Sequence, residues 1–470
     1  MNTAPSLIPM PSSLRLTPFE EYMLADNLPA YPMCCFIKIK LQGQFNVAVF
    51  EAALQRTLEN QPLLTGSVTE RNGKYYWRKA DTFPAVSRAS LDENRPVGED
   101  GNTARQFPRS NGIDLFNEPA LKITICNANA DSAKVLLNGR TEIVFEVHHS
   151  ASDALGLLRF MEDTLCQYAQ AVGFAAAKRK QVEPDLLVRR GLPRHSYRNM
   201  LQILAKQLHG LRRAWKFLTY RVTPLTATKP ADLQKLCEDY PAILFRELSE
   251  SQTQDAVQKA KELGITLNEL FLCSAFFAMK NWQNMPFGRN LRIAVPINLR
   301  TPADELMPAA NIVSMVFLDR KSKDIRPVQT FYDGIHHEMS HIKRHNLGWA
   351  LIRGLTIYRR VFGNYRKMMH PDRCWTTATV SNLGKVFANT PLPKLNGNVL
   401  IDHSLELLGV EASPPVRSST ALGICMMTYA DRLTINLHYD AAVLTQADGE
   451  RIVDDIYRFA TSHTTQQMDG

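Results

Sequence analysis

The chain has 470 residues, of which 45% are hydrophobic and 21% charged, and its formal net charge is +9. These proportions are typical of a globular protein, the length suits two domains, and no apolar run approaches the roughly 20 residues that cross a bilayer. The N-terminus lacks the pattern of a secretory signal, and the eight cysteines lack the spacing of metal ligands or of a disulfide framework, so we expect a cytoplasmic protein.

The positive charge is concentrated in one segment, residues 178–221, where twelve basic residues face only two acidic ones. We interpret residues 186–235 as a basic linker that contains an amphipathic helix at about 197–218. Its apolar side either packs on its own domain, or the segment binds an acidic carrier protein, CoA phosphates or an anionic membrane surface. We expect no nucleic-acid partner, because no recognition motif accompanies the charge.

The first half of the chain alternates between helix and strand signals. Apolar residues recur at helical spacing in some segments, whereas runs of branched and aromatic residues are typical of strands. The Asn72-Gly73 pair between two such runs predicts a β-hairpin. The expected elements are helices at 19–25, 45–58 and 153–171 and strands at 34–41, 64–77, 121–127 and 142–147.

The second half begins near Tyr240 and again mixes helices with strands. Ser249 and Gln252 have the spacing of a capping box, and Pro327 is expected in the first turn of a helix. The expected elements are strands at 242–248, 291–299, 312–318, 376–381 and 405–410, helices at 249–263, 266–282, 327–343 and 447–460, and a hairpin over 421–439 that turns at Ala430-Asp431. Because neither half shows regular βαβ alternation, we expect an α/β protein with mixed sheets (α+β), divided into residues 1–185, the linker 186–235 and residues 236–470.

One stretch carries residues suited to catalysis. The strand at 142–147 leads directly into His148 and His149, and Asp153 follows a short polar turn at the start of a helix. An imidazole with an ordinary pKa of about 6.5 can accept a proton near neutral pH, and Asp153 is placed to cap the helix. A buried histidine pair followed by an ordinary helix cap would explain the same residues.

The stretch resembles the His-His-x-x-x-Asp-Gly signature of the condensation-domain superfamily, which includes peptide-synthetase condensation domains, wax ester synthases and alcohol O-acetyltransferases. Five further segments resemble motifs of that superfamily, in the right order and over nearly the whole chain. They are Leu16-Thr17-Pro18 with Glu20 or Glu21, residues 41–64 ending in Gln61-Pro62-Leu63-Leu64, residues 264–270, Val295-Pro296-Ile297-Asn298-Leu299-Arg300, and Thr379-Val380-Ser381-Asn382-Leu383-Gly384.

The resemblance implies two chloramphenicol-acetyltransferase-like halves in a V, with a channel between them and a channel-lining crossover near 376–400. It implies acyl transfer from a thioester donor, acyl-CoA or acyl carrier protein, to a hydroxyl acceptor, without a bound cofactor or metal. Amide formation by a free-standing condensation enzyme is the alternative reaction. Peripheral contact with a membrane, and a lipid or glycolipid acceptor, are compatible with the basic segment.

Residue by residue, the resemblance implies a base, a supporting pair and a channel lining. They are His149 as general base with His148 as its neighbour, Asp153 with Arg300 from the other half as its salt-bridge partner, and Ser381 with Asn382 near the developing oxyanion. A solvated cation at Arg300 and a plain turn at Ser381-Asn382 are the alternative interpretations.

The sequence departs from the signature at Ala154, which stands where the superfamily has glycine. If that position needs a positive φ, alanine costs about 1 kcal/mol or more, whereas a need for space alone is met by a small side chain. The departure favours the rival interpretation, a catalytically silent binding or carrier-docking module of the same fold. The retained His148, His149 and Asp153 favour the enzyme.

A second motif, His337-Glu338-Met339-Ser340-His341, matches the H-E-x-x-H pattern of zinc proteases. Two histidines four apart on a helix can bind zinc, but a third ligand is needed. Arg344 stands where the extended motif has glycine, and no glutamate follows before Glu406. We therefore interpret the segment as a solvated helix.

Overall fold

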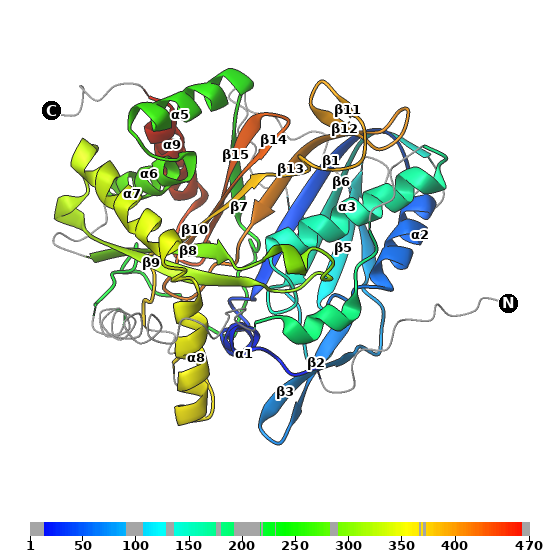
Figure 1. Cartoon of the computed structure of the whole chain (residues 1–470), viewed down its shortest axis with the longest axis horizontal. Coiled ribbons are helices and arrows are strands. Elements are labelled where there is room, and N and C mark those ends of the chain that lie inside the picture. Colours follow the sequence, from blue (N-terminus) through cyan, green and yellow to red (C-terminus); the bar gives the residue numbers. More distant parts are fainter. Residues whose placement is uncertain are drawn as a thin grey trace.

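The strands form two large mixed sheets that lie side by side, each with helices packed against it (Figure 1). The computed structural model describes residues 14–90, 107–127, 136–174, 180–191, 217, 220–230, 232–282, 290–365, 368–369 and 373–462. Within these residues one sheet has seven strands, the other has six, and a two-stranded hairpin stands apart. The mixed α/β class expected from the sequence is confirmed.

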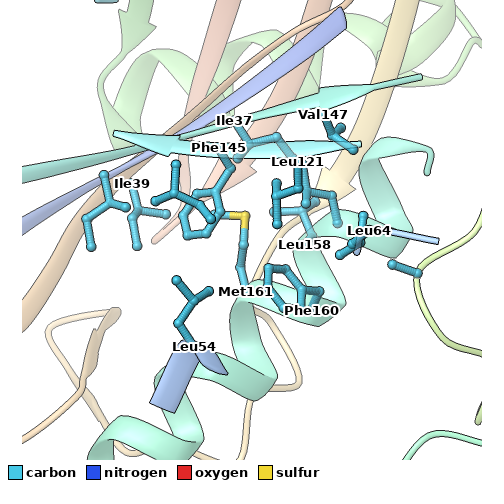
Figure 2. Close-up of a cluster of buried hydrophobic side chains, with 14 of the residues drawn as sticks. Ile37, Ile39, Leu54, Leu64, Leu121, Phe145, Val147, Leu158, Phe160 and Met161 are labelled. Atoms are coloured by element: carbon cyan, nitrogen blue, oxygen red, sulfur yellow. The ribbon is translucent and has the colours of Figure 1, made fainter. Parts of the chain in front are cut away.

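The seven-stranded sheet packs against two helices, α2 (Val47–Leu58) and α3 (Ala154–Ala171). Its strands, in spatial order, are β11 (Lys394–Leu395), β12 (Asn398–Leu400), β13 (Glu406–Ser413), β1 (Cys34–Asn46), β6 (Leu136–His148), β5 (Leu121–Asn127) and β4 (Val86–Ser90). Alternate side chains such as Ile37 and Phe145 meet Leu158 and Met161 of α3 in a buried core (Figure 2). Each such buried side chain contributes about 1.5–3 kcal/mol.

The six-stranded sheet carries a larger set of helices. Its strands, in spatial order, are β7 (Ile243–Leu248), β15 (Arg432–Tyr439), β14 (Leu422–Tyr429), β10 (Ala378–Lys385), β8 (Asn290–Asn298) and β9 (Val313–Lys321). The helices of this half are α5 (Glu250–Glu262), α6 (Leu267–Asn281), α7 (Gln329–Arg344), α8 (Trp349–Phe362) and α9 (Gln446–Thr461). The short helix α1 (Pro18–Ala25) of the first half lies beside α8 (Figure 1). The hairpin consists of β2 (Gly66–Arg71) and β3 (Lys74–Lys79).

A crossover ties the two halves together. After β10 the chain leaves the six-stranded sheet, completes the other sheet through β11, β12 and β13, and returns as β14 and β15. β13 pairs antiparallel with β1, and the buried Lys38 Nζ lies 2.8 Å from the Glu411 carboxylate and 3.4 Å from that of Glu142. The strands of residues 236–470 therefore do not all belong to one sheet. The crossover continues to Ser413.

Many of the expected elements are present with shifted ends. Ser249 caps α5 in a capping box with Gln252, and β14 and β15 turn at Ala430 and Asp431, whose φ angles are 46° and 56°. The expected place of Pro327 is wrong, because Val328 is the N-cap of α7 and the helix begins at Gln329. The sequence did not predict β4 or α8, and the expected helix at 197–218 lies outside the described residues except at Phe217.

No single described helix has both the length and the apolar composition of a membrane span. The bent pair α5 and α6 meets that test only jointly, with 92° between the two helices. Most of α6 is buried in the core beneath the six-stranded sheet, which accounts for its apolar composition.

Candidate functional site

The histidine pair lies at the end of β6, in the central part of the seven-stranded sheet. His148 is the last residue of the strand and pairs with Cys34 of β1. His149 leaves the strand, and its backbone N–H donates to the carbonyl of Met33 at 2.7 Å. The turn that follows is closed by a bond from the Ala151 N–H to the His148 carbonyl at 2.8 Å. The backbone of the pair is therefore held from both sides.

The imidazole of His149 is half-buried and lines a cavity. Its Nδ1 lies 3.1 Å from the Ser152 carbonyl oxygen, which can only accept a hydrogen bond. The proton of the neutral ring is thus on Nδ1, and Nε2 carries the free lone pair. Burial lowers the pKa of His149 below its ordinary value, and the Asp153 carboxylate opposes that shift in part. His149 is therefore neutral, and able to accept a proton, at pH 7.

His148 has a different environment. Its side chain is fully buried, and its Nδ1 accepts a bond from the Ser150 N–H at 3.2 Å. Burial, reinforced by neighbouring His149, lowers the pKa of His148 to about 3. His148 therefore stays neutral and packs beneath the turn, outside the residues that line the cavity.

Asp153 is buried and caps α3. One carboxylate oxygen accepts the Gly156 N–H at 2.9 Å, and the other accepts the Ile312 N–H at 2.8 Å. Arg300 forms the salt bridge that the resemblance implies: its Nη1 donates to Asp153 at 2.7 Å, while its Nη2 donates to the Ala310 carbonyl at 3.0 Å. The pair joins the start of α3 to a segment of the other half.

A residue that the sequence did not single out completes this junction. Asn311 donates from Nδ2 to the carbonyl of His149 at 2.7 Å and lies 3.1 Å from the sulfur of Met23. It precedes β9, in the same segment as Ala310 and Ile312. The loop that carries the base is thus held by a segment about 160 residues later in the chain, and no spacing rule connects positions so far apart.

Ser381 and Asn382 lie on β10 of the six-stranded sheet and line the same cavity as His149. The Ser381 hydroxyl donates a long bond of 3.4 Å to the Ile424 carbonyl. The Asn382 side-chain oxygen accepts the Gly384 N–H at 2.8 Å, which leaves its amide N–H groups as donors. The structure therefore brings together, around one cavity, residues that were predicted from two distant motifs.

The cavity has a volume of about 540 Å³ and is lined by residues from both sheets. This volume lies within the roughly 300–1,000 Å³ typical of small-molecule sites. Its charged lining includes two ion pairs, Arg292 with Asp319 at 2.6 Å and Arg417 with Asp26. Most other lining residues are apolar, so the cavity favours a largely uncharged ligand.

Ala154 is the first residue of α3 and also lines the cavity. Its φ is not among the positive values of the described chain, so alanine causes no backbone strain there. The tight position is Gly156: an added Cβ would lie 2.7 Å from the Ser152 hydroxyl and 3.1 Å from Arg300 Nη2. The departure from the superfamily signature therefore leaves the backbone of the site intact.

The H-E-x-x-H segment lies on α7. Glu338 forms an ion pair with Arg320 at 2.9 Å, and the ring of His341 lies 4.4 Å from that of His345, centroid to centroid. In the part of the chain that the structure describes, no group of three or more metal-binding side chains is close enough to hold a metal ion.

Known structures resemble the chain over almost its full length. The trichothecene 15-O-acetyltransferase TRI3 of Fusarium sporotrichioides has a TM-score of 0.70 at 11% identity, over 98% of this chain and 99% of that one. The first condensation domain of the calcium-dependent antibiotic synthetase, bound to a substrate analogue, has a TM-score of 0.67 at 15% identity, over 96% of each chain. A mutant of the starter condensation domain of the rhizomide synthetase RzmA, in complex with C8-CoA and Leu-SNAC, has a TM-score of 0.65 at 14% identity, over 97% of each.

No protein-family model and no curated protein sequence matches the chain. At these low identities the likeness of the structures concerns the fold. The chain has the two-lobed fold of these acetyltransferase and condensation domains, and the two-lobed α/β fold expected from the sequence motifs is confirmed.

Proposed function

We propose that the chain transfers an acyl group from a thioester, acyl-CoA or an acyl carrier protein, to a hydroxyl acceptor, with His149 as the general base. The observation that carries the proposal is the state of this imidazole. Nδ1 is bound to the Ser152 carbonyl, Nε2 keeps its lone pair, burial keeps the ring neutral, and the ring lines a cavity with the volume of a small-molecule site. Neighbours of the same fold are named as an acetyltransferase and condensation domains.

In the proposed reaction, Nε2 of His149 removes the proton of the acceptor hydroxyl as its oxygen attacks the thioester carbonyl carbon. The tetrahedral intermediate carries its negative charge on the former carbonyl oxygen. The Asn382 amide is a candidate donor to that oxyanion. The Ser381 hydroxyl is a second candidate once it turns away from the Ile424 carbonyl, to which it donates only a long bond of 3.4 Å. Collapse of the intermediate breaks the C–S bond, and the departing thiolate takes the proton from the His149 imidazolium, which yields an ester and a free thiol.

Asp153 supports this chemistry without touching the reacting atoms. Its oxygens are occupied by Gly156, Ile312 and Arg300, so it holds the start of α3 and the junction to the other half. Holding both substrates beside one base lowers the barrier chiefly by proximity. No covalent enzyme intermediate is part of the proposal.

Amide formation is the second candidate reaction, because the condensation domains share the fold and one of them is bound to C8-CoA and Leu-SNAC. An amine acceptor would meet the same base. The rival binding-module interpretation loses its main support, since Ala154 causes no strain. A carrier or membrane contact through 178–221 and a cytoplasmic location stay predictions, because most of that segment lies outside the described residues.

The test is thiol release from acyl-CoAs and acyl carrier proteins, with alcohols and amines as acceptors. We expect release that depends on the acceptor and is lost at least 100-fold in His149→Ala. Activity should fall as the pH drops through the lowered pKa of His149, on the acid side of 6.5. The matched control is His341→Ala, an exposed histidine on α7 that does not line the cavity.

Equal turnover in wild type and His149→Ala would contradict the proposed base. A loss of activity in His341→Ala that zinc restores would favour the metal interpretation instead. Wild-type protein that binds both donors and transfers to neither acceptor class would support the binding module.

A further inference from the structure

An apolar path leads from the His149 loop toward α8. Met33 accepts the His149 N–H through its carbonyl, and Met23 contacts Asn311, which binds the His149 carbonyl. Both methionines belong to a buried apolar cluster that also contains Leu355 of α8. The His149 loop and α8 therefore both contact one apolar cluster, which contains Met23 and Met33.

One face of α8 lines the same cavity as His149. The residues of this face recur at helical spacing, from Ala350 to Phe362, so the face runs along the cavity for about 18 Å. We call the part of the cavity along this face the α8 groove. Its lining from α8 is Ala350, Leu351, Gly354, Leu355, Ile357, Tyr358, Val361 and Phe362, and its other walls include Met23, Met33, Met315 and Met368.

The outer part of the groove is unusually apolar for a surface. Ile357, Val361 and Phe362 are 64%, 66% and 52% exposed, and all three line the cavity. Exposed apolar side chains that continue into a cavity mark a binding site for an apolar ligand. The methionines of the walls are flexible and polarizable, and they adapt to ligands without one rigid shape.

We propose that the α8 groove holds a long, flexible hydrocarbon chain carried by one of the two substrates of the transfer reaction. The inference rests on the proposed function and names the substrate class of that site. The chain would lie along α8 with its reactive end at His149, and it would cover the exposed Ile357, Val361 and Phe362. The donor's acyl chain and the acceptor's alkyl chain share this chemistry.

Gly354 provides the means to test the groove. It lies in the middle of α8 and lines the cavity, and a Cβ added there meets no atom within 4 Å. A Cβ at this position points into open space beside the groove, so a large side chain has room to enter the groove. Gly334 of α7 is the matched control: it is also helical and exposed, it lies outside the cavity lining, and its added Cβ approaches only Arg320 Nη2, at 4.0 Å.

The experiment compares wild type, Gly354→Trp and Gly334→Trp. Thiol release is measured with acetyl-, octanoyl-, dodecanoyl- and hexadecanoyl-CoA and one fixed acceptor, and then with acetyl-CoA and alcohols of the same lengths. We expect kcat/KM of wild type to rise about two- to fourfold per added methylene until the groove is filled, in one of the two series. Gly354→Trp should lose at least tenfold more rate on the long members of that series than on the short ones, and Gly334→Trp should resemble wild type. The series that responds identifies which substrate carries the chain.

A binding measurement separates the two proposals. Fluorescence of cis-parinaric acid, an eighteen-carbon chain, should rise on binding to wild type and Gly334→Trp and be lost in Gly354→Trp. If wild type transfers acetyl groups but neither chain length nor Gly354→Trp changes rate or binding, the groove proposal is overturned while acyl transfer stands. If no donor turns over but cis-parinaric acid still binds in a Gly354-dependent way, acyl transfer fails and the groove stands.

Discussion

Replacing Arg300 with methionine removes its salt bridge to Asp153, one of those between the halves, while keeping a side chain of similar length. The Asp153 carboxylate, only 3% exposed, would keep the Gly156 and Ile312 N–H donors and lose its one cationic partner among the described residues. Breaking a buried ion pair on one side costs about 3–5 kcal/mol. Because the Arg300 side chain is 19% exposed, water screens part of this loss, and we expect the free energy of unfolding to fall by about 2–3 kcal/mol.

The same change should slow catalysis. Arg300 also donates to the Ala310 carbonyl, next to Asn311, which holds the His149 backbone. A misplacement of about 1 Å at a catalytic group costs on the order of 100-fold in rate, so we expect kcat to fall about 10- to 100-fold. Lysine cannot bond to Asp153 and Ala310 in the fork geometry of arginine, so Arg300→Lys should give intermediate values.

Urea unfolding and thiol-release kinetics measure both effects, and a double-mutant cycle with Asp153→Asn isolates the pair. A coupling energy of at least 1 kcal/mol is expected for a direct interaction. If Arg300→Met unfolds at the wild-type urea concentration and turns over at the wild-type rate, the second half does not hold the base in the way argued above.

Two further predictions concern stability. Gly156→Ala should lower the free energy of unfolding by about 1–3 kcal/mol, because its Cβ would lie 2.7 Å from the Ser152 hydroxyl. Gly354→Ala should raise the free energy of unfolding by up to about 1 kcal/mol, because alanine favours a helix more than glycine does. Urea unfolding curves that rank the two variants in the opposite order would contradict the packing argument. Burial lowers the pKa of His438 to about 4, so this histidine stays neutral in the fold and gains a proton on unfolding below pH 6.5. Its contribution to stability is therefore complete above pH 6.5 and is lost at about 1.4 kcal/mol per pH unit down to pH 4, and the difference in unfolding free energy between wild type and His438→Phe should show that slope rather than stay flat.

The fold was predictable where local signals agree with packing. Three local features lie where the sequence predicts them, because each depends on atoms a few residues apart. They are the turn at Asn72-Gly73, the capping box at Ser249 and the turn at Ala430-Asp431. α8 was not predicted. Its apolar face lines the cavity, but Ile357 and Val361 on that face are 64% and 66% exposed instead of packed in the core.

The partition into halves shows the same limit. The predicted linker at 186–235 divides the chain into two halves, each of which carries part of the motif set. β13 comes from the second half but belongs to the sheet of the first half. What places β13 there is its pairing with β1 and the buried bond between Lys38 and Glu411, and these residues are more than 370 positions apart. Nothing in the local sequence around Glu411 predicts that partner.

The candidate site could likewise be predicted from the sequence only in part. His149 and Asp153 belong to one short motif, so their roles could be inferred from the sequence and from its resemblance to a known signature. The contacts that hold the His149 loop and Asp153 in place come from Arg300, Asn311 and Ile312 of the other half. A base whose loop is held by a second lobe is in place only when the two lobes are joined, and the cavity that both lobes line exists only then. The proposed reaction therefore depends on the junction between the two lobes. Substitutions of residues in that junction should affect stability and rate together.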